Sequence, residues 1–412
     1  MAGISREFAP PFKLIAPFFL LGSVFYLLSA VMLFQIDLTH TISSQDLHVV
    51  SWTHLFLLGF VMMTIFGAMA QLIPVVLERG HAKVSYYYAI WPLLGIGALL
   101  MSFGFMYNFT YLSIGGALVL LSMFIFSIEL FFTLAKGGRF DIMIFSVAVS
   151  NIFLLTGVIL GFLMALSFSG ILDIDVANLL KAHVYMVIGG YVLITIMSFS
   201  YIMLPMFGLS HGFSKKPLEI AIMMQCIGVV IVFISSVYGI EMLGKVGYFL
   251  SFLSIIIYFY LIYLINNTRA RKENDMYIMS LFASFAFFAL AVVFGALYLV
   301  REIEMYLFAS SWLLFVGFFG FLITGHLYKI VPFLVWYEKF SPLVGKQKVP
   351  MLFDMVPTKS ANIQIVLTGC GIVLVLFAIL FQNYALHVAG TSFLTLGACF
   401  LVYNLIYMIR FK

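Results

Sequence analysis

Apolar residues along this chain fall into long runs separated by short polar segments. Each run is long enough to cross a hydrocarbon core of about 30 Å as a helix, which takes roughly 20 residues. A helix also satisfies its own backbone hydrogen bonds, which lipid cannot do. Twelve runs are therefore expected to be membrane-spanning helices: 13–35, 50–78, 87–107, 110–135, 141–168, 180–208, 217–239, 244–266, 276–299, 304–335, 362–382 and 385–409.

The basic residues between the runs predict how the helices are oriented. If the N-terminus is inside, 18 of the 21 Lys and Arg residues fall on the inner side, and only Lys181, Lys245 and Arg301 fall on the outer side. Basic residues are enriched in cytoplasmic segments of membrane proteins. Both ends of the chain are therefore predicted to be cytoplasmic, in a multi-pass protein of the cell's inner (cytoplasmic) membrane.

Composition supports this class of protein. The chain is 64% hydrophobic and 9% charged, whereas soluble domains hold about 25% charged residues. Most of its surface must therefore face lipid, and the bilayer is its expected partner. The net charge of +5 arises from residues that lie between the apolar runs. No nucleic-acid partner is expected.

Three of the expected helices share a pattern. They begin near His54, His183 and Trp312, which are 129 residues apart, and each reaches a proline 20 to 22 residues later. A fixed period is typical of repeated architecture. We predict an all-α fold, a single transmembrane domain of three pseudo-repeated four-helix arcs (approximately 13–135, 141–266 and 276–409), with the second helix of each arc ending at its proline. Chance recurrence of Gly, Pro and His is the alternative.

Twelve helices in three such arcs resemble subunit I of the heme–copper oxidases and nitric oxide reductases. His54 opens a long helix that closes on Leu72-Ile73-Pro74, as does the histidine that binds the low-spin heme in that family. His183, on the sixth helix, resembles the first copper ligand. The resemblance implies a heme, of b type, and metal ligation by His54 and His183. It also implies respiratory electron transfer or binding of NO or O₂, with respiratory membrane subunits or a cytochrome as partners.

The sequence departs from the family at most of its metal ligands. The tenth helix of the family begins with two histidines, and the matching positions here are Ser310 and Trp312. The family also has a histidine pair on its seventh helix, but no histidine lies between His211 and His326. A complete binuclear centre cannot be assembled from these residues. Ordinary oxygen reduction and copper binding are therefore not expected, and whether the protein is an oxidoreductase stays open.

His54, His183 and His326 are the candidate cofactor-binding residues. Imidazole is the common protein ligand of heme iron, and ionisable groups within a membrane usually serve a function. The alternative for His54 and His183 is an interfacial histidine bonded to a carbonyl or a headgroup. For His326, proton transfer or packing is an equal alternative. The other histidines, including His81 and His387, fall in loops or at helix ends and are expected to be solvated.

A proton path is a second candidate feature. Glu129 is a carboxylate well inside an apolar run, where it must be protonated, paired or facing a cavity; it could instead extend inward toward Lys136. On the sixth helix, Tyr191, Thr195 and Ser198 fall at i, i+4 and i+7 and so lie on one face. They could pass protons, or they could join helices by hydrogen bonds.

Three classes of function remain open from the sequence. The first is a divergent heme-binding protein of the heme–copper oxidase subunit I type. The second is a transporter or channel, without cofactor, for a small solute or a metal. The third is a structural subunit of a larger membrane complex. A visible spectrum of the purified protein separates the first from the others.

Overall fold

The computed structural model describes residues 10–39, 46–77, 80–137 and 141–412. Helices make up almost all of them, and these ranges contain no strand, only an isolated bridge between Ser210 and Arg269. The helices are α1 (Phe12–Met32), η1 (Leu33–Gln35), α2 (Leu47–His54), η2 (Leu55–Met62), α3 (Met63–Leu77), η3 (Val84–Tyr86), α4 (Tyr87–Met106), α5 (Thr110–Ala135), α6 (Ile142–Phe168), α7 (Val176–Val184), η4 (Tyr185–Val192), α8 (Leu193–Gly208), α9 (Lys216–Tyr238), α10 (Glu241–Asn267), α11 (Met276–Arg301), α12 (Glu304–Trp312), η5 (Leu313–Phe319), α13 (Gly320–Lys339), η6 (Ser341–Leu343), α14 (Thr358–Phe381) and α15 (Tyr384–Ile409).

The expected number of membrane-spanning helices is confirmed. In the part of the chain that the structure describes, twelve continuous helical stretches are long and apolar enough to cross a membrane. The protein is therefore a multi-pass, all-α membrane protein. The tenth stretch runs further than expected, from Glu304 to Lys339. The orientation stays a prediction, and three of the basic residues on which it rests (Arg6, Arg79 and Arg139) lie outside the described ranges.

Helix starts follow a simple chemical rule. A side chain that accepts a hydrogen bond from the first turn satisfies one of its otherwise unpaired N–H groups. Asp46, Asp141, Asp175, Asp275 and Asn383 do this at the starts of α2, α6, α7, α11 and α15. Polar loop residues next to apolar runs therefore set several of the helix boundaries.

The three helices that share the sequence pattern also share a local irregularity. Each contains a π-helical segment (η2, η4 and η5), and two of these segments begin directly after His54 and Trp312. Pro74, Pro205 and Pro332 lie inside α3, α8 and α13 rather than at their ends. The prediction that these helices end at proline is therefore wrong. Neighbouring helices in a membrane can accommodate the backbone group that a proline leaves unpaired.

A phenylalanine packs against a glycine at each of the three π-helical segments. The pairs are Phe25 with Gly59, Phe153 with Gly190, and Phe287 with Gly317. In each pair the ring occupies the place that a glycine Cβ would need, so only glycine permits this approach. The contact joins the first, fifth and ninth spans to the second, sixth and tenth. It recurs at the spacing of the predicted arcs and supports them, while the threefold arrangement itself stays a prediction.

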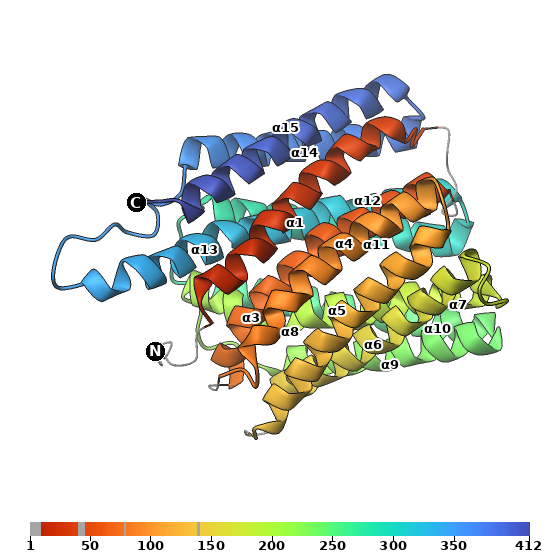
Figure 1. Cartoon of the computed structure of the whole chain (residues 1–412), viewed down its shortest axis with the longest axis horizontal. Coiled ribbons are helices and arrows are strands. Elements are labelled where there is room, and N and C mark those ends of the chain that lie inside the picture. The colour runs from red at the N-terminus through yellow and green to blue at the C-terminus, as the bar shows by residue number, and fades with distance from the viewer. Residues whose placement is uncertain (1–9, 40–45, 78–79, 138–140) are drawn as a thin grey trace. The chain divides into compact units, whose positions relative to one another are not determined.

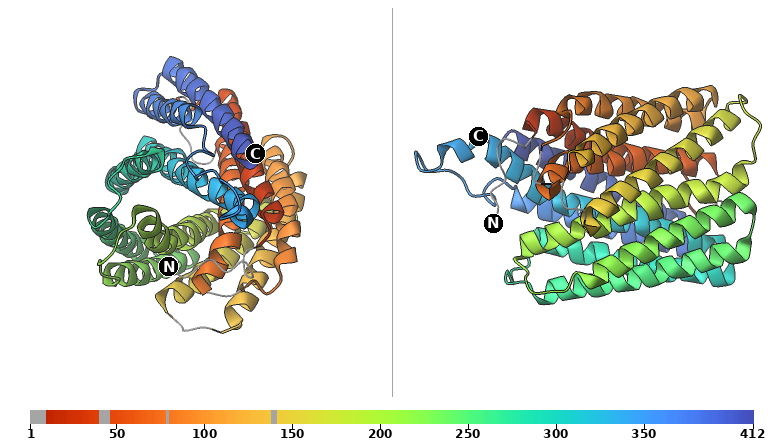
Figure 2. Two further views of the ribbon diagram at one scale, coloured as in Figure 1. Left: turned by 90° about the vertical axis from the view of Figure 1, so that its left-hand side faces the viewer. Right: turned by 90° about the horizontal axis from the view of Figure 1, so that it is seen from below.

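The chain forms two compact units. The first holds residues 73–93 and 109–273, and the second holds residues 10–72, 94–108 and 274–412. Within the first unit, α9 lies beside α10 and α5 beside α6 (Figures 1 and 2). Within the second unit, α14 lies beside α15, α1 packs on α15, and α11 packs on α12 and α13.

Candidate functional site

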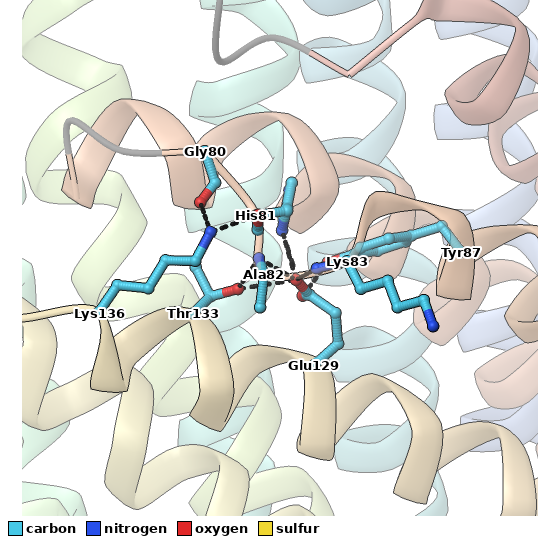
Figure 3. A network of polar contacts seen from close by, with 8 residues as sticks. All are labelled: Gly80, His81, Ala82, Lys83, Tyr87, Glu129, Thr133 and Lys136. Carbon is cyan, nitrogen blue, oxygen red and sulfur yellow. Dashed lines mark hydrogen bonds and ion pairs between the residues drawn. The ribbon is translucent and has the colours of Figure 1, made fainter.

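Glu129 lies at the centre of a buried polar group in the first unit. Its side chain is fully buried on α5, and the segment from Gly80 to Lys83 covers it (Figure 3). Oε1 accepts hydrogen bonds from the backbone N–H groups of Ala82, at 3.0 Å, and Lys83, at 3.4 Å. The hydroxyl of Thr133, one turn further along α5, donates to the same oxygen at 2.7 Å.

His81 pairs with this carboxylate. Its Nδ1 lies 3.1 Å from both Glu129 oxygens, and its side chain is only 1% exposed. The ring also makes an edge contact with Tyr87, whose hydroxyl lies 3.5 Å from Oε2. An ionised carboxylate is only an acceptor. Ala82, Lys83, Thr133 and Tyr87 present donors to it, and His81 does so in the tautomer that carries its proton on Nδ1. The pocket therefore accommodates the negative charge and places a second titratable group in direct contact with it.

Lys136 holds the covering segment in place. Its Nζ donates to the carbonyl oxygens of Gly80, at 3.0 Å, and His81, at 2.7 Å. The alternative in which Glu129 extends toward Lys136 is therefore not what the structure shows. The carboxylate turns toward His81 and the backbone of residues 82 and 83, and the lysine binds the far side of the same segment (Figure 3).

The sixth span contributes a tyrosine to this region. Tyr191, 1% exposed in η4, lies within electrostatic range of Tyr87. Glu129 is therefore bonded to Tyr87, while a proton path that continues through Tyr191 stays a prediction. Thr195 is buried, and its hydroxyl has no hydrogen-bond partner among the described residues. Ser198 instead donates to the Ile194 carbonyl of its own helix.

His54 faces the third span. Its Nδ1 lies 2.8 Å from the Val50 carbonyl oxygen, and its ring packs 5.0 Å from that of Phe105. Two residues away, and so near the opposite side of the helix, Trp52 stacks on Trp312 with ring centroids 5.9 Å apart. The tryptophan pair is a buried contact between the second and tenth spans.

These residues do not fit a heme held between the second and tenth spans. Such a heme would need the space that Trp52 and Trp312 occupy, and it would need His54 to face the tenth span. Ser310, the other position that matches a family histidine, donates to the Ala291 carbonyl. Heme binding by His54 therefore stays a prediction that requires another face of the helix.

His183 joins two helices of the first unit. Its Nδ1 lies 2.7 Å from the Gly157 carbonyl oxygen of α6. The ring lies directly on Gly161, one turn further on, where a Cβ would come within 2.6 Å of the imidazole. The bond to the Gly157 carbonyl agrees with one alternative that the sequence left open, a histidine bonded to a carbonyl; metal ligation by His183 stays a prediction.

His326 contacts an aromatic neighbour. Its Nδ1 lies 2.7 Å from the Leu322 carbonyl oxygen, and its Nε2 lies 3.4 Å from the Tyr277 hydroxyl. The two rings meet edge to face at 5.1 Å. Across the described ranges, no three His, Cys, Asp or Glu side chains come together as a metal site would require.

Sequence reasoning missed two buried histidines. His81 and His387 were expected to be solvated, but both are buried. His81 lies in a short segment without periodicity, and its contact with Glu129 is 48 residues distant in the chain. For His387 a signal existed, because Thr391 and Thr395 follow it at helical spacing.

A comparison with models of known protein families finds no match to this sequence. A comparison with the curated proteins finds no match either.

Proposed function

We propose that this protein transfers protons between the side predicted to be cytoplasmic and the membrane interior. In this proposal the His81–Glu129 pair takes up the proton. One observation carries it: a fully buried carboxylate and a buried imidazole lie 3.1 Å apart within a membrane-spanning bundle. Ionisable groups in such surroundings are costly and usually serve a function. Histidine and carboxylate are also the side chains that most often donate and accept protons in proteins.

The neighbouring hydroxyl groups are candidates to accept the proton from the pair and pass it on. Tyr87 contacts the carboxylate, and Tyr191 lies in electrostatic range of Tyr87. The buried Thr195 hydroxyl is one turn further along the sixth span, and polar atoms left without a protein partner at such depth are commonly bonded to water. Together these groups continue the polar region from the pair into the bundle.

The test is proton flux in vesicles. Purified protein is reconstituted with a pH-sensitive dye inside, and a potassium gradient with valinomycin supplies the driving force. We expect Glu129→Gln to lower the flux at least tenfold, because the amide cannot exchange the proton. The matched control is Glu219→Gln, which alters an exposed carboxyl in the first turn of α9. Equal flux in wild type and Glu129→Gln would contradict the proposal.

Two classes of membrane protein could use such a transferred proton. The resemblance to the heme–copper oxidases favours a heme-binding protein of the respiratory inner membrane, in electron transfer or in binding of NO or O₂. The Trp52–Trp312 stack favours the second class, a transporter that couples protons to a small solute or a metal, because it closes the position of the low-spin heme. A Soret band in protein purified from heme-supplied cells decides for the first class.

A further inference from the structure

A second chain of polar side chains runs inside the second unit, among α1, α13, α14 and α15. Ser360 Oγ donates to Asn404 Oδ1 at 2.5 Å, and Asn404 Nδ2 donates to the Tyr328 hydroxyl at 2.8 Å. That hydroxyl donates to Gln364 Oε1 at 3.2 Å, and Gln364 Nε2 donates to Thr368 Oγ1 at 2.9 Å. Asn404 and Gln364 are fully buried, and Tyr328 and Thr368 are 2% and 1% exposed.

Polar groups continue from Thr368 toward the other end of the unit. The Tyr26 hydroxyl on α1 lies near Thr368 and is buried, with no hydrogen-bond partner among the described residues. On α15, Thr395, Thr391 and His387 follow at four-residue spacing and therefore lie on one face. The last of them reaches the end of the first span, where His387 Nε2 lies 3.0 Å from the Leu33 carbonyl oxygen.

Three polar atoms of these α15 side chains have no hydrogen-bond partner among the described residues. The hydroxyls of Thr391 and Thr395 and the Nδ1 atom of His387 are buried, with no hydrogen-bond partner in the part of the chain that the structure describes. Leaving one such group unbonded costs about 1–3 kcal/mol. Ser392, in contrast, bonds the Val388 carbonyl of its own helix at 2.8 Å. Thr391 and Thr395 do not use this local solution, so a water molecule would be needed to bond them.

The geometry suits a file of water molecules. Residues four apart on a helix are about 6 Å apart along its axis, so a water between two of these groups can bond to both. Buried waters typically make about three such bonds. From His387 to Asn404, 17 residues apart, the helix rises about 25 Å. That distance is most of a hydrocarbon core of about 30 Å.

We infer that the second unit contains a water-filled path that conducts protons between its Ser360 end and its His387 end. The path is separate from the His81–Glu129 pair, which belongs to the first unit. The named groups of the path carry hydroxyl, amide and imidazole functions and no carboxylate or ammonium. A metal cation or an anion would therefore lack a counter-charge within it, whereas protons can pass along bonded waters and hydroxyls.

Radiolytic hydroxyl-radical labelling of the purified wild-type protein tests the water directly. Radicals formed from waters beside a side chain oxidise that side chain, and mass spectrometry locates the product. We expect Tyr26 and Tyr328 to be oxidised at least fivefold faster than Phe19, an equally buried ring on α1. Thr391→Val, which keeps the side-chain volume, should reduce the labelling of Tyr26. Oxidation of both tyrosines no faster than that of Phe19 would show a dry path and overturn the inference.

Proton flux into vesicles tests whether the path conducts protons. In the Glu129→Gln background, where flux through the first unit is lost, Gln364→Leu should lower the remaining flux at least tenfold. Ser392→Ala should leave that flux unchanged, because Ser392 bonds only its own helix. If the tyrosines are labelled but Gln364→Leu leaves the flux unchanged, the water in the path is structural. The inference that the path conducts protons would then be wrong. If the tyrosines are not labelled and the flux still depends on Glu129, the water-filled path is overturned while the proposal for the His81–Glu129 pair stands. Absence of flux in the wild type would overturn both proton proposals.

Discussion

His81 Nδ1 lies at the same distance, 3.1 Å, from both carboxylate oxygens of Glu129, and both side chains are closed off from solvent. This symmetric contact leaves the carboxylate able to accept four further hydrogen bonds, from Ala82, Lys83, Thr133 and Tyr87. A buried carboxylate with this many donors is held firmly while it remains in contact with a partner that can exchange its proton.

The first prediction concerns the stability that these bonds provide. Glu129→Leu should lower the free energy of unfolding by about 3–5 kcal/mol, because it leaves His81 and the backbone N–H of Lys83 buried without this acceptor; the N–H of Ala82 keeps the Thr133 hydroxyl, at 2.8 Å. Glu129→Gln keeps one carbonyl oxygen as an acceptor and should cost less than half as much. Thermal unfolding in detergent measures both variants. Equal loss in the two would show that the hydrogen bonds contribute little.

Lys136 should stabilise the protein by holding the segment from Gly80 to Lys83. Lys136→Met keeps most of the side-chain bulk but removes the bonds to the Gly80 and His81 carbonyls, so we expect a loss of about 1–3 kcal/mol. Lys215→Met is the control, because its partly exposed ion pair with Asp141 should contribute below about 1 kcal/mol. Unfolding temperatures of the two variants measure the difference. A larger loss for Lys215→Met would contradict the role given to Lys136.

The repeated contact between phenylalanine and glycine predicts three similar mutants. Gly59→Ala, Gly190→Ala and Gly317→Ala each insert a methyl group where a ring already lies, and each should cost about 1–3 kcal/mol. The control is Gly320→Ala, where the nearest atom to a new Cβ is 3.9 Å away. It should be neutral or stabilising. A neutral result at any of the three positions would remove that pair from the proposed repeat.

The tryptophan stack predicts a spectrum. Since Trp52 and Trp312 occupy the interface between the second and tenth spans, protein purified from heme-supplied cells should show no six-coordinate bis-histidine heme. If a Soret band is present, His54→Ala should remove it and His183→Ala should retain it, because the His183 ring lies against α6. A bis-histidine spectrum would mean that the stack opens and the family site is formed.

The twelve spans could be predicted from the sequence because lipid imposes one condition on every run. The backbone must bond to itself over the thickness of the membrane, so length and hydropathy are sufficient. The buried Glu129 could also be found, because an isolated carboxylate in an apolar run is conspicuous. Its partner His81 could not, because a four-residue loop segment carries no periodic signal and the contact forms only when residues 80–83 fold against α5.

The sequence also could not predict which neighbouring helix each histidine side chain faces. His54 and Trp52 are two positions apart, and which of them faces the tenth span depends on the rotation of the helix and on the π-helical segment that follows. The sequence does not specify that rotation. The polar face of α15 can be predicted from the four-residue spacing of His387, Thr391 and Thr395. The burial of His387 cannot, because it depends on packing against the end of α1.

Infrared difference spectroscopy of the carboxyl group tests the central claim most directly. A proton gradient imposed on reconstituted wild-type protein should produce a change in the carbonyl band of a buried carboxylic acid, as Glu129 takes up and releases its proton. The band should be absent in Glu129→Gln and retained in Glu219→Gln. If the wild type and Glu129→Gln give the same difference spectrum, Glu129 keeps one protonation state and the pair with His81 is a structural contact, not a proton-uptake group.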